Sequence, residues 1–335
     1  MSRWLLTACI LLVASLLAGL AVGPVHVSAL GIVEDALSHL PFLDAGTRLP
    51  RVEEAIVWDL RAPRVLLGAL VGGMLALSGG AYQAVFRNPL ADPYLLGAAA
   101  GAGLGATLAI AYGHGDDGLR PLAAFAGAAV AAAAAYLLGA TAGVGRGTTT
   151  LLLAGVAIAS FLTAAQTFVL QRNSDTVREV YSWILGQLDT AGSGDILLVA
   201  PYIAVSAAVI LAHRRLLDVL RIGDEEASSL GVDVGRVRLI VLAAATVGTA
   251  AAISVCGLIG FVGIVVPHTV RLLAGASYRV VLPLSLLFGA SFLVLADIVS
   301  RTVVSPAELP IGVVTAAVGA PFFAFVLRSG RWVGV

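Results

Sequence analysis

The sequence predicts an all-α polytopic membrane protein with about ten transmembrane helices. Hydrophobic residues make up 59% of the 335 residues and charged residues only 12%, whereas a soluble domain has roughly 45–50% and 25%. The mean hydropathy is +0.98. Such a chain has too few polar groups to cover a globular surface in water, and its length allows roughly ten spans of about 20 residues joined by short loops.

Apolar windows of spanning length follow one another along the chain. The first window covers 4–23, and a polar stretch follows at 34–61. The other nine windows lie near 64–83, 94–112, 119–139, 148–170, 194–213, 238–256, 258–274, 280–300 and 309–327. The eighth of the ten is short and contains Pro267. We therefore expect a single transmembrane domain over 1–335.

The first window has a second interpretation, as a secretory signal peptide. Arg3 precedes the apolar run, and Val27-Ser28-Ala29 loosely resembles a cleavage site. The run from Trp4 to Val22 has about 19 residues, longer than the roughly 7–15 of a signal-peptide core. We expect a retained first membrane helix, which an intact N-terminus in the mature protein would confirm.

Small residues are concentrated in the apolar windows. Residues 97–105 read GAAAGAGLG, and 123–135 are almost entirely Ala and Gly. Small residues let helix backbones approach closely in lipid. We expect most of these glycines to serve tight packing and a few to mark unwound segments beside a pathway.

The composition excludes several kinds of chemistry. All 20 basic residues are arginines, so the chain has no Walker A lysine and no Schiff-base lysine. Any ATP hydrolysis that drives this protein must occur on another subunit. Cys9, Cys256 and five scattered histidines show neither disulfide nor metal spacing, and a net charge of zero does not suggest a nucleic-acid partner.

The arginines predict the orientation in the membrane. Ten spans place both termini on one side, and twelve arginines fall on that side. The opposite side holds eight: Arg48, Arg51, Arg61, Arg64, Arg120, Arg172, Arg178 and Arg301. The positive-inside rule then makes the side of the termini cytoplasmic.

One cytoplasmic connection, 214–237, is too polar to span the membrane. Ala227 to Leu230 can form a short helix, with Asp224-Glu225-Glu226 at its N-terminal end, where the helix dipole favours negative charge. Gly231 suits a helix C-terminus. The connection is either a solvated loop or a lever on which a cytoplasmic partner pushes.

Several blocks of the sequence resemble segments of one protein family, and they occur in the same order along the chain. They are RAPRVLLGALVGGMLALSGGAYQAVFRNPLADPYLLGAAAGAGLGA (61–106), 181–186, GDEEASSLGVDVGRVR (223–238), GLIGFVGIVVPHTVRLLAG (257–275), LADIVSR (295–301) and AELPIGVVTAAVGAPFF (307–323). They are similar to the FecCD-type permeases, the inner-membrane subunits of ABC importers for iron-siderophores, haem and cobalamin. The resemblance runs from about residue 60 to the end.

The resemblance implies a type II ABC importer permease fold of ten spans, which works as a homodimer in the bacterial inner membrane. The path would lie along the dimer axis. Two ATPase subunits, which carry ATP and Mg, would dock from the cytoplasm, and a periplasmic binding protein would deliver the substrate. The chain itself would bind no cofactor and catalyse no covalent chemistry.

Arg61 and Arg64 are three residues apart and share a helical face, and Arg301 lies at the end of the ninth window. The resemblance implies that these arginines receive acidic residues of the binding protein, because guanidinium groups recognise carboxylates in a planar, bidentate way. The alternative is that they snorkel toward lipid headgroups.

The resemblance also assigns the coupling to the ATPase to part of the connection 214–237. The candidate residues are Gly223, Asp224, Glu225, Glu226, Ala227, Leu230 and Gly231. Closure of the ATPases would shift this segment and switch the bundle between outward-open and inward-open states. Arg87-Asn88-Pro89-Leu90 lies on the same side and is interpreted as a supporting turn, because Pro89 ends or redirects a helix.

The candidate substrate path follows the fifth window, where the resemblance places the outer gate. Gln166, Arg172 and Arg178 are the candidates, and the two arginines could attract an anionic ligand. The alternative is local pairing of Arg178 with Asp175. His268 follows Pro267 and is expected to be a buried polar contact rather than a ligand.

Haem is the favoured substrate, because Arg172 and Arg178 at the entrance resemble those of haem-type permeases and few aromatic residues are at hand for a bulky siderophore. Ferric siderophores and cobalamin remain the alternative substrates.

An ion-coupled secondary transporter is an alternative class of protein, and it would need ionisable residues inside the membrane. Asp297 is the main candidate for such a residue, and it could instead pair with Arg301 at i,i+4. No catalytic dyad supports an intramembrane enzyme.

Overall fold

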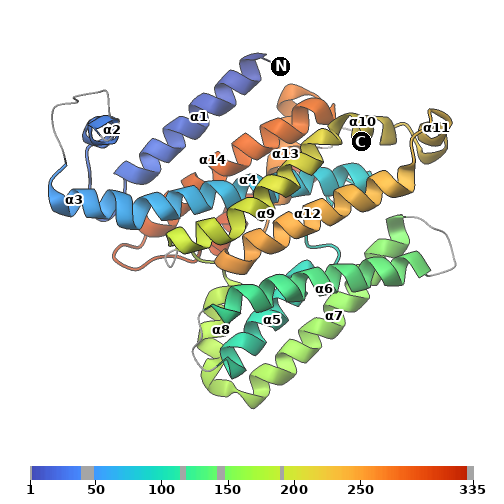
Figure 1. Ribbon diagram of the computed structural model, residues 1–335, viewed down its shortest axis with the longest axis horizontal. Coiled ribbons are helices and arrows are strands. Elements are labelled where there is room, and N and C mark those ends of the chain that lie inside the picture. The colour runs from blue at the N-terminus through green and yellow to red at the C-terminus, as the bar shows by residue number, and fades with distance from the viewer. Residues whose placement is uncertain (1, 39–48, 114–117, 142–147, 189–191, 330–335) are drawn as a thin grey trace.

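The computed structural model describes residues 2–38, 49–113, 118–141, 148–188 and 192–329. In these residues the regular structure is entirely helical, which confirms the all-α prediction (Figure 1). Of the eight arginines assigned to the outer side, Arg48 lies outside the described residues.

Ten helices correspond to the ten predicted windows. Seven are long and apolar enough to cross a membrane, counting α4 with the short helices before it, and three are shorter apolar helices, α5, α13 and α15. The ten are α1 (Ser2–Ala21), α4 (Ala62–Phe86), α5 (Ala98–Tyr112), α6 (Leu119–Thr141), α7 (Thr148–Arg172), α9 (Ser193–Ala212), α12 (Val234–Cys256), α13 (Val262–Ala274), α14 (Tyr278–Thr302) and α15 (Ile311–Ser329).

The polar regions form short helices at the two ends of the bundle. At one end lie α2 (Ala29–Ser38) and α3 (Arg51–Ala55), which continues through a π-helical turn, Ile56–Arg61, into α4. At the other end lie α10 (Arg214–Leu220) and α11 (Asp224–Ser229) (Figure 1). We call these the α2 end and the α11 end. A 3₁₀ turn, Ser174–Thr176, and α8 (Val177–Ile184) connect α7 to α9.

A buried carboxylate holds α2 against the segment 49–58. Asp35 is fully buried, and its two carboxylate oxygens accept hydrogen bonds from the Leu49 amide at 3.2 Å and the Trp58 indole at 2.8 Å. Val27, Ile32 and Val57 form a small apolar cluster beside them. The α2 end therefore has a core of its own.

Helix α4 is the centre of the main bundle and is buried along most of its length. Its neighbours approach so closely that only glycine fits at the contacts. A Cβ on Gly79 would lie 1.9 Å from the carbonyl oxygen of Gly263 on α13, and one on Gly72 would lie 2.4 Å from that of Gly289 on α14. Here the small residues serve close helix packing.

Helices α5, α6 and α7 form a second group, set apart in Figure 1 from the helices around α4. Gly101 of α5 and Gly127 of α6 face each other, since a Cβ on either would lie within 2.2 Å of the other's carbonyl oxygen. We call this group the α5–α7 lobe. It packs against α12 of the main bundle.

An irregular segment, 257–261, separates α12 from α13. Gly257 has a φ of +74°, and a Cβ there would lie 2.0 Å from the carbonyl oxygen of Trp183. The Tyr94 hydroxyl donates to the carbonyl of Ile259 at 2.9 Å. Non-helical backbone at membrane depth is tolerated where protein buries it, and this segment is an instance of the expected unwound glycines.

Candidate functional site

The three candidate docking arginines come together at the α2 end, although 240 residues separate Arg61 from Arg301 in the sequence. Arg61 ends the π-helical turn, Arg64 lies in the first turn of α4, and Arg301 lies in the last turn of α14. The close packing of α14 on α4 places them side by side.

Arg64 joins two acidic residues. Its Nε donates to Oδ1 of Asp297 at 2.8 Å, and its two Nη atoms make a bidentate pair with Glu308 at 3.0 and 2.7 Å. The exposed fractions of these side chains are 11% for Arg64, 36% for Glu308 and 2% for Asp297. The cluster therefore has a buried carboxylate at its base and an exposed ion pair at its surface.

Arg301 contacts Asp297 from the other side. Its Nε lies 3.4 Å from Oδ2 of Asp297, so the i,i+4 pair that the sequence suggested is present. Its Nη2 donates to the carbonyl oxygen of Gly19, on α1, at 2.6 Å. The guanidinium thus links the end of α14 to the last turn of α1.

Arg61 also binds the end of α1. Its Nη1 donates to the carbonyl oxygens of Leu20 at 2.7 Å and Ala21 at 3.0 Å, and its Nη2 donates to that of Val25. The last carbonyls of a helix have no intrahelical partners, and a nearby cation satisfies them. Since Arg61 and Arg301 are both buried against α1, these contacts tie the end of α1 to α4 and α14.

Of the three arginines, Arg64 is the one that makes a surface ion pair. Sequence reasoning did not find its partner Glu308, which is 244 residues away and lies in the connection between α14 and α15. It also did not find the carbonyl groups that Arg61 and Arg301 bind. Docking of a partner on these residues stays a prediction.

The candidate coupling residues form one compact projection at the α11 end. The short helix begins at Asp224, three residues earlier than predicted, and Gly223 and Gly231 flank it with φ of +130° and +82°. Ala227 is buried, whereas Leu230 is 65% exposed. Glu225 and Glu226 are also exposed.

Asp224 ties this projection to two membrane helices. Its Oδ1 lies 2.8 Å from Nη2 of Arg238, in the first turns of α12, and 3.2 Å from Nη2 of Arg87. Arg87 follows α4 in a left-handed conformation, with a φ of 49°. A displacement of α11 would therefore act directly on α4 and α12.

The candidate path residues fall into two environments. Gln166 is 9% exposed and donates to the hydroxyl of Thr107 on α5 at 3.0 Å, so it lies between α7 and α5. Arg172 and Arg178 are exposed, and the Arg172 guanidinium lies 5.9 Å from the centre of the Phe168 ring. Arg172 thus ends α7, and Arg178 lies in the first turn of α8.

Glu179 and His268 both contact other side chains of the protein. Glu179 lies 3.7 Å from Arg120, at the start of α6. His268 is buried, and its ring meets that of Phe322 edge to face, with 6.2 Å between the centres. Among the described residues, no group of three or more His, Cys, Asp or Glu side chains is placed to hold a metal ion.

The comparison with protein families decides the identity of the chain. The model of the FecCD transport family matches residues 10–329. The chain belongs to this family. Its members are permease subunits of ABC importers for iron chelates, haem and cobalamin, and they work with separate ATPase and substrate-binding partners.

The similarity of the chain to individual permeases agrees with this family assignment. The chain is 43% identical to the cobalamin import system permease protein BtuC of Halobacterium salinarum, over 84% of this chain and 75% of that protein. It is 38% identical to the hemin transport system permease protein HmuU of Yersinia pestis, over 82% and 84%.

A solved structure shows the same architecture. A protein assigned to the metal-chelate type of ABC transporter, in an inward-facing conformation, matches with a TM-score of 0.84 and 26% identity over 98% of this chain and all of that one. The FecCD-family chain is therefore a multi-pass membrane permease of an ABC importer.

Proposed function

We propose that this FecCD-family permease carries haem inward across the bacterial inner membrane as a homodimer, with both termini in the cytoplasm. Two ATPase subunits dock at the α11 end, and a periplasmic binding protein docks at the α2 end. Two charged groups at opposite ends of an apolar bundle support this: the Arg64–Glu308 pair at the α2 end and the acidic side chains of α11. Arg172, which ends α7, and Arg178, on α8, are both exposed.

Haem suits the exposed arginines. A propionate is a carboxylate, and a guanidinium binds a carboxylate with two parallel hydrogen bonds. Phe168, beneath the Arg172 guanidinium, offers an aromatic face for a flat macrocycle. Cobalamin is the second candidate, because a permease of a cobalamin import system is 43% identical to this chain.

The dimer has a candidate surface in α7. Large apolar side chains are exposed along it, including Leu153, Val156, Phe161 and Phe168, each at least 61% exposed. A second copy that packs beside this helix would place two α7 helices, and four arginines, around one axis. The substrate would then pass between the two protomers.

Uptake into proteoliposomes tests the substrate. We expect the chain, reconstituted with its ATPase and binding protein, to be isolated with two permease copies and to import haem when ATP is present inside. Arg172→Glu with Arg178→Glu should lower haem uptake at least about tenfold, because two contacts to the propionates, worth roughly 1.5–3 kcal/mol each, become repulsive. Arg51→Glu, at an exposed arginine of α3, is the control.

The outcomes separate the two substrates. Import of cobalamin but not haem, with no effect of the double variant, would assign the permease to cobalamin. Equal haem uptake by the double variant and the parent would remove Arg172 and Arg178 from the path. A single permease copy in the active complex would contradict the homodimer.

For docking, we propose that Arg64 makes the contact and that Arg61 and Arg301 hold it in place. Arg64 makes the exposed ion pair with Glu308, whereas the other two arginines bind carbonyls of α1. An acidic side chain of the binding protein would replace Glu308 on the Arg64 guanidinium. Exposed pairs contribute roughly 0–1 kcal/mol each, so they orient the partner more than they hold it.

Two variants test this exchange in opposite directions. Glu308→Gln should strengthen association of the binding protein, by up to about fivefold at low salt, because Arg64 loses its competing carboxylate. Arg64→Glu should weaken association and remove most of its salt dependence. Arg51→Glu, an exposed arginine of α3, is the control, and surface plasmon resonance in nanodiscs is the measurement. Weaker association of Glu308→Gln would contradict the exchange.

A further inference from the structure

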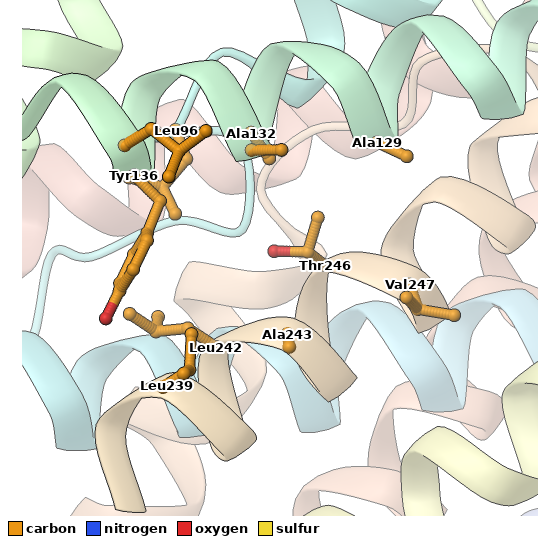
Figure 2. Close-up of a pocket in the computed structure, with 11 residues that line it drawn as sticks. Leu96, Ala129, Ala132, Tyr136, Leu239, Leu242, Ala243, Thr246 and Val247 are labelled. Carbon is orange, nitrogen blue, oxygen red and sulfur yellow. The ribbon is translucent and has the colours of Figure 1, made fainter. Parts of the chain in front are cut away.

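An apolar groove lies between α6 and α12, where the α5–α7 lobe meets the main bundle. Its volume is about 460 Å³. Leu96 and Leu242, both 2% exposed, form its floor, and Leu137 and Leu239, 64% and 46% exposed, stand at its rim. Figure 2 shows the Tyr136 ring reaching from α6 toward Leu239 and Leu242 of α12. The groove is thus deep and opens to the outside of the chain.

The lining offers an occupant almost only hydrocarbon. Tyr136 and Thr246 are the lining residues with polar side chains, and the Thr246 hydroxyl is already hydrogen-bonded to that of Tyr82 at 2.8 Å. An ordered water needs two to four polar partners, which these walls do not supply. At membrane depth the abundant hydrocarbon is the acyl chain of a lipid.

The groove extends from the middle of α6 and α12 toward their α11 ends. Tyr136 and Leu137 are close to the end of α6 at Thr141, and Leu239 is close to the beginning of α12 at Val234. Its other end, at Ala129 and Val247, lies near the middle of the two helices, so the groove runs along the helices from mid-span toward the α11 end.

A cation lies beyond the groove on the same helical face. Arg236 precedes Leu239 by three residues and Ala243 by seven, a spacing that places all three on one side of α12. The Arg236 side chain is exposed. The nearby carboxylate of Asp233 is occupied in capping α12, since it accepts the Arg236 backbone amide at 3.0 Å.

We propose that this groove is a binding site for one anionic phospholipid. An acyl chain lies between α6 and α12, and the headgroup phosphate contacts Arg236. The neighbouring Arg238 is bonded to Asp224 of α11, so the lipid lies beside the helix that carries the α11 contact. The charge at the end of the groove selects an anionic headgroup, and the bound chain fills the seam between the lobe and the bundle.

Photo-crosslinking tests the site on the full-length chain in nanodiscs. The probe is phosphatidylglycerol with a diazirine on one acyl chain, and mass spectrometry maps the labelled peptides. We expect labelling of 129–137 and 239–247, in competition with unlabelled phosphatidylglycerol and several-fold more weakly with phosphatidylcholine. Ala133→Phe and Ala243→Phe, which narrow the groove from its exposed rim, should lower this labelling about tenfold.

Two further variants make the result specific. Ala126→Phe adds the same ring at an exposed position of α6 outside the groove and should leave the labelling unchanged. Arg236→Gln should abolish the preference for phosphatidylglycerol over phosphatidylcholine.

Labelling that persists in both groove variants would overturn the site. Equal labelling by the two lipids in the parent would overturn the anionic headgroup. A disulfide between two copies of Ala133→Cys would show that a second protomer covers the groove, and would also overturn the proposal.

Discussion

Asp297→Asn is expected to destabilise the folded chain by about 3–5 kcal/mol, the cost of removing one partner from a buried ion pair. The amide has the size of the carboxylate but no charge. Arg64 and Arg301 contact the two oxygens of Asp297 at 2.8 and 3.4 Å. Arg64 would keep its pair with Glu308, but Arg301, which is buried, would be left without its counter-ion. We expect a strong fall in membrane yield and in the thermal midpoint measured in detergent.

Glu308→Gln is the matched control. It makes the same chemical change on another partner of Arg64, but the Glu308 side chain is 36% exposed and that of Asp297 is 2% exposed. An exposed pair contributes roughly 0–1 kcal/mol, so this variant should remain close to the parent in thermal midpoint. Similar losses in the two variants would show that burial does not set the role of Asp297.

A rescue variant separates charge from shape. Replacing a buried ion pair by apolar residues of similar volume is often neutral. Asp297→Leu combined with Arg301→Met should therefore be more stable than Asp297→Leu alone, although the contact of Arg301 with Gly19 is lost. No recovery in the double variant would mean that the carbonyl contact to α1 is the dominant role of Arg301.

Hydropathy and length predicted the membrane helices well, because in lipid each span must satisfy its own backbone hydrogen bonds. The window 280–300 lies within α14, Tyr278–Thr302. The window 258–274 began four residues before α13, Val262–Ala274. Residues 257–261 are apolar and look like helix, but their backbone is fixed by Trp183 and Tyr94 from distant segments, and a hydropathy window cannot detect such contacts.

For the candidate sites, the sequence predicted which residues are near each other along a helix, but not which of them are buried or what they contact. A helical spacing of three placed Arg61 and Arg64 together, and a spacing of four paired Asp297 with Arg301. Burial was not predictable, because whether an arginine faces water or the end of another helix depends on packing between α1, α4 and α14. The contact of Gln166 with Thr107 on α5 was likewise not predictable from spacing, and the place of Gln166 beside the path stays a prediction.

Glu226→Arg is expected to abolish transport by preventing productive association with the ATPase. Glu225 and Glu226 are exposed on α11, where we propose that the ATPase docks, and we expect these acidic side chains to meet basic side chains of the ATPase. Like charges brought together at an interface cost several kcal/mol, so we expect association to weaken at least about a hundredfold. Asp224 and its two arginines remain in place, and the variant should still fold and bind the binding protein.

Three comparisons isolate the interface charge. The Glu226 carboxylate lies against Gly223, because a Cβ on Gly223 would be 2.0 Å from that carboxylate. Glu226→Arg would therefore also disturb the start of α11. Glu226→Gln, which keeps the shape, should retain most of the association, and Glu225→Arg should reproduce the loss. Asp59→Arg, an equal charge reversal at the α2 end, should leave ATPase binding unchanged. Normal ATP-driven uptake by both Glu226→Arg and Glu225→Arg would exclude α11 as the coupling element. The contacts of Asp224 with Arg87 and Arg238 would then be structural only.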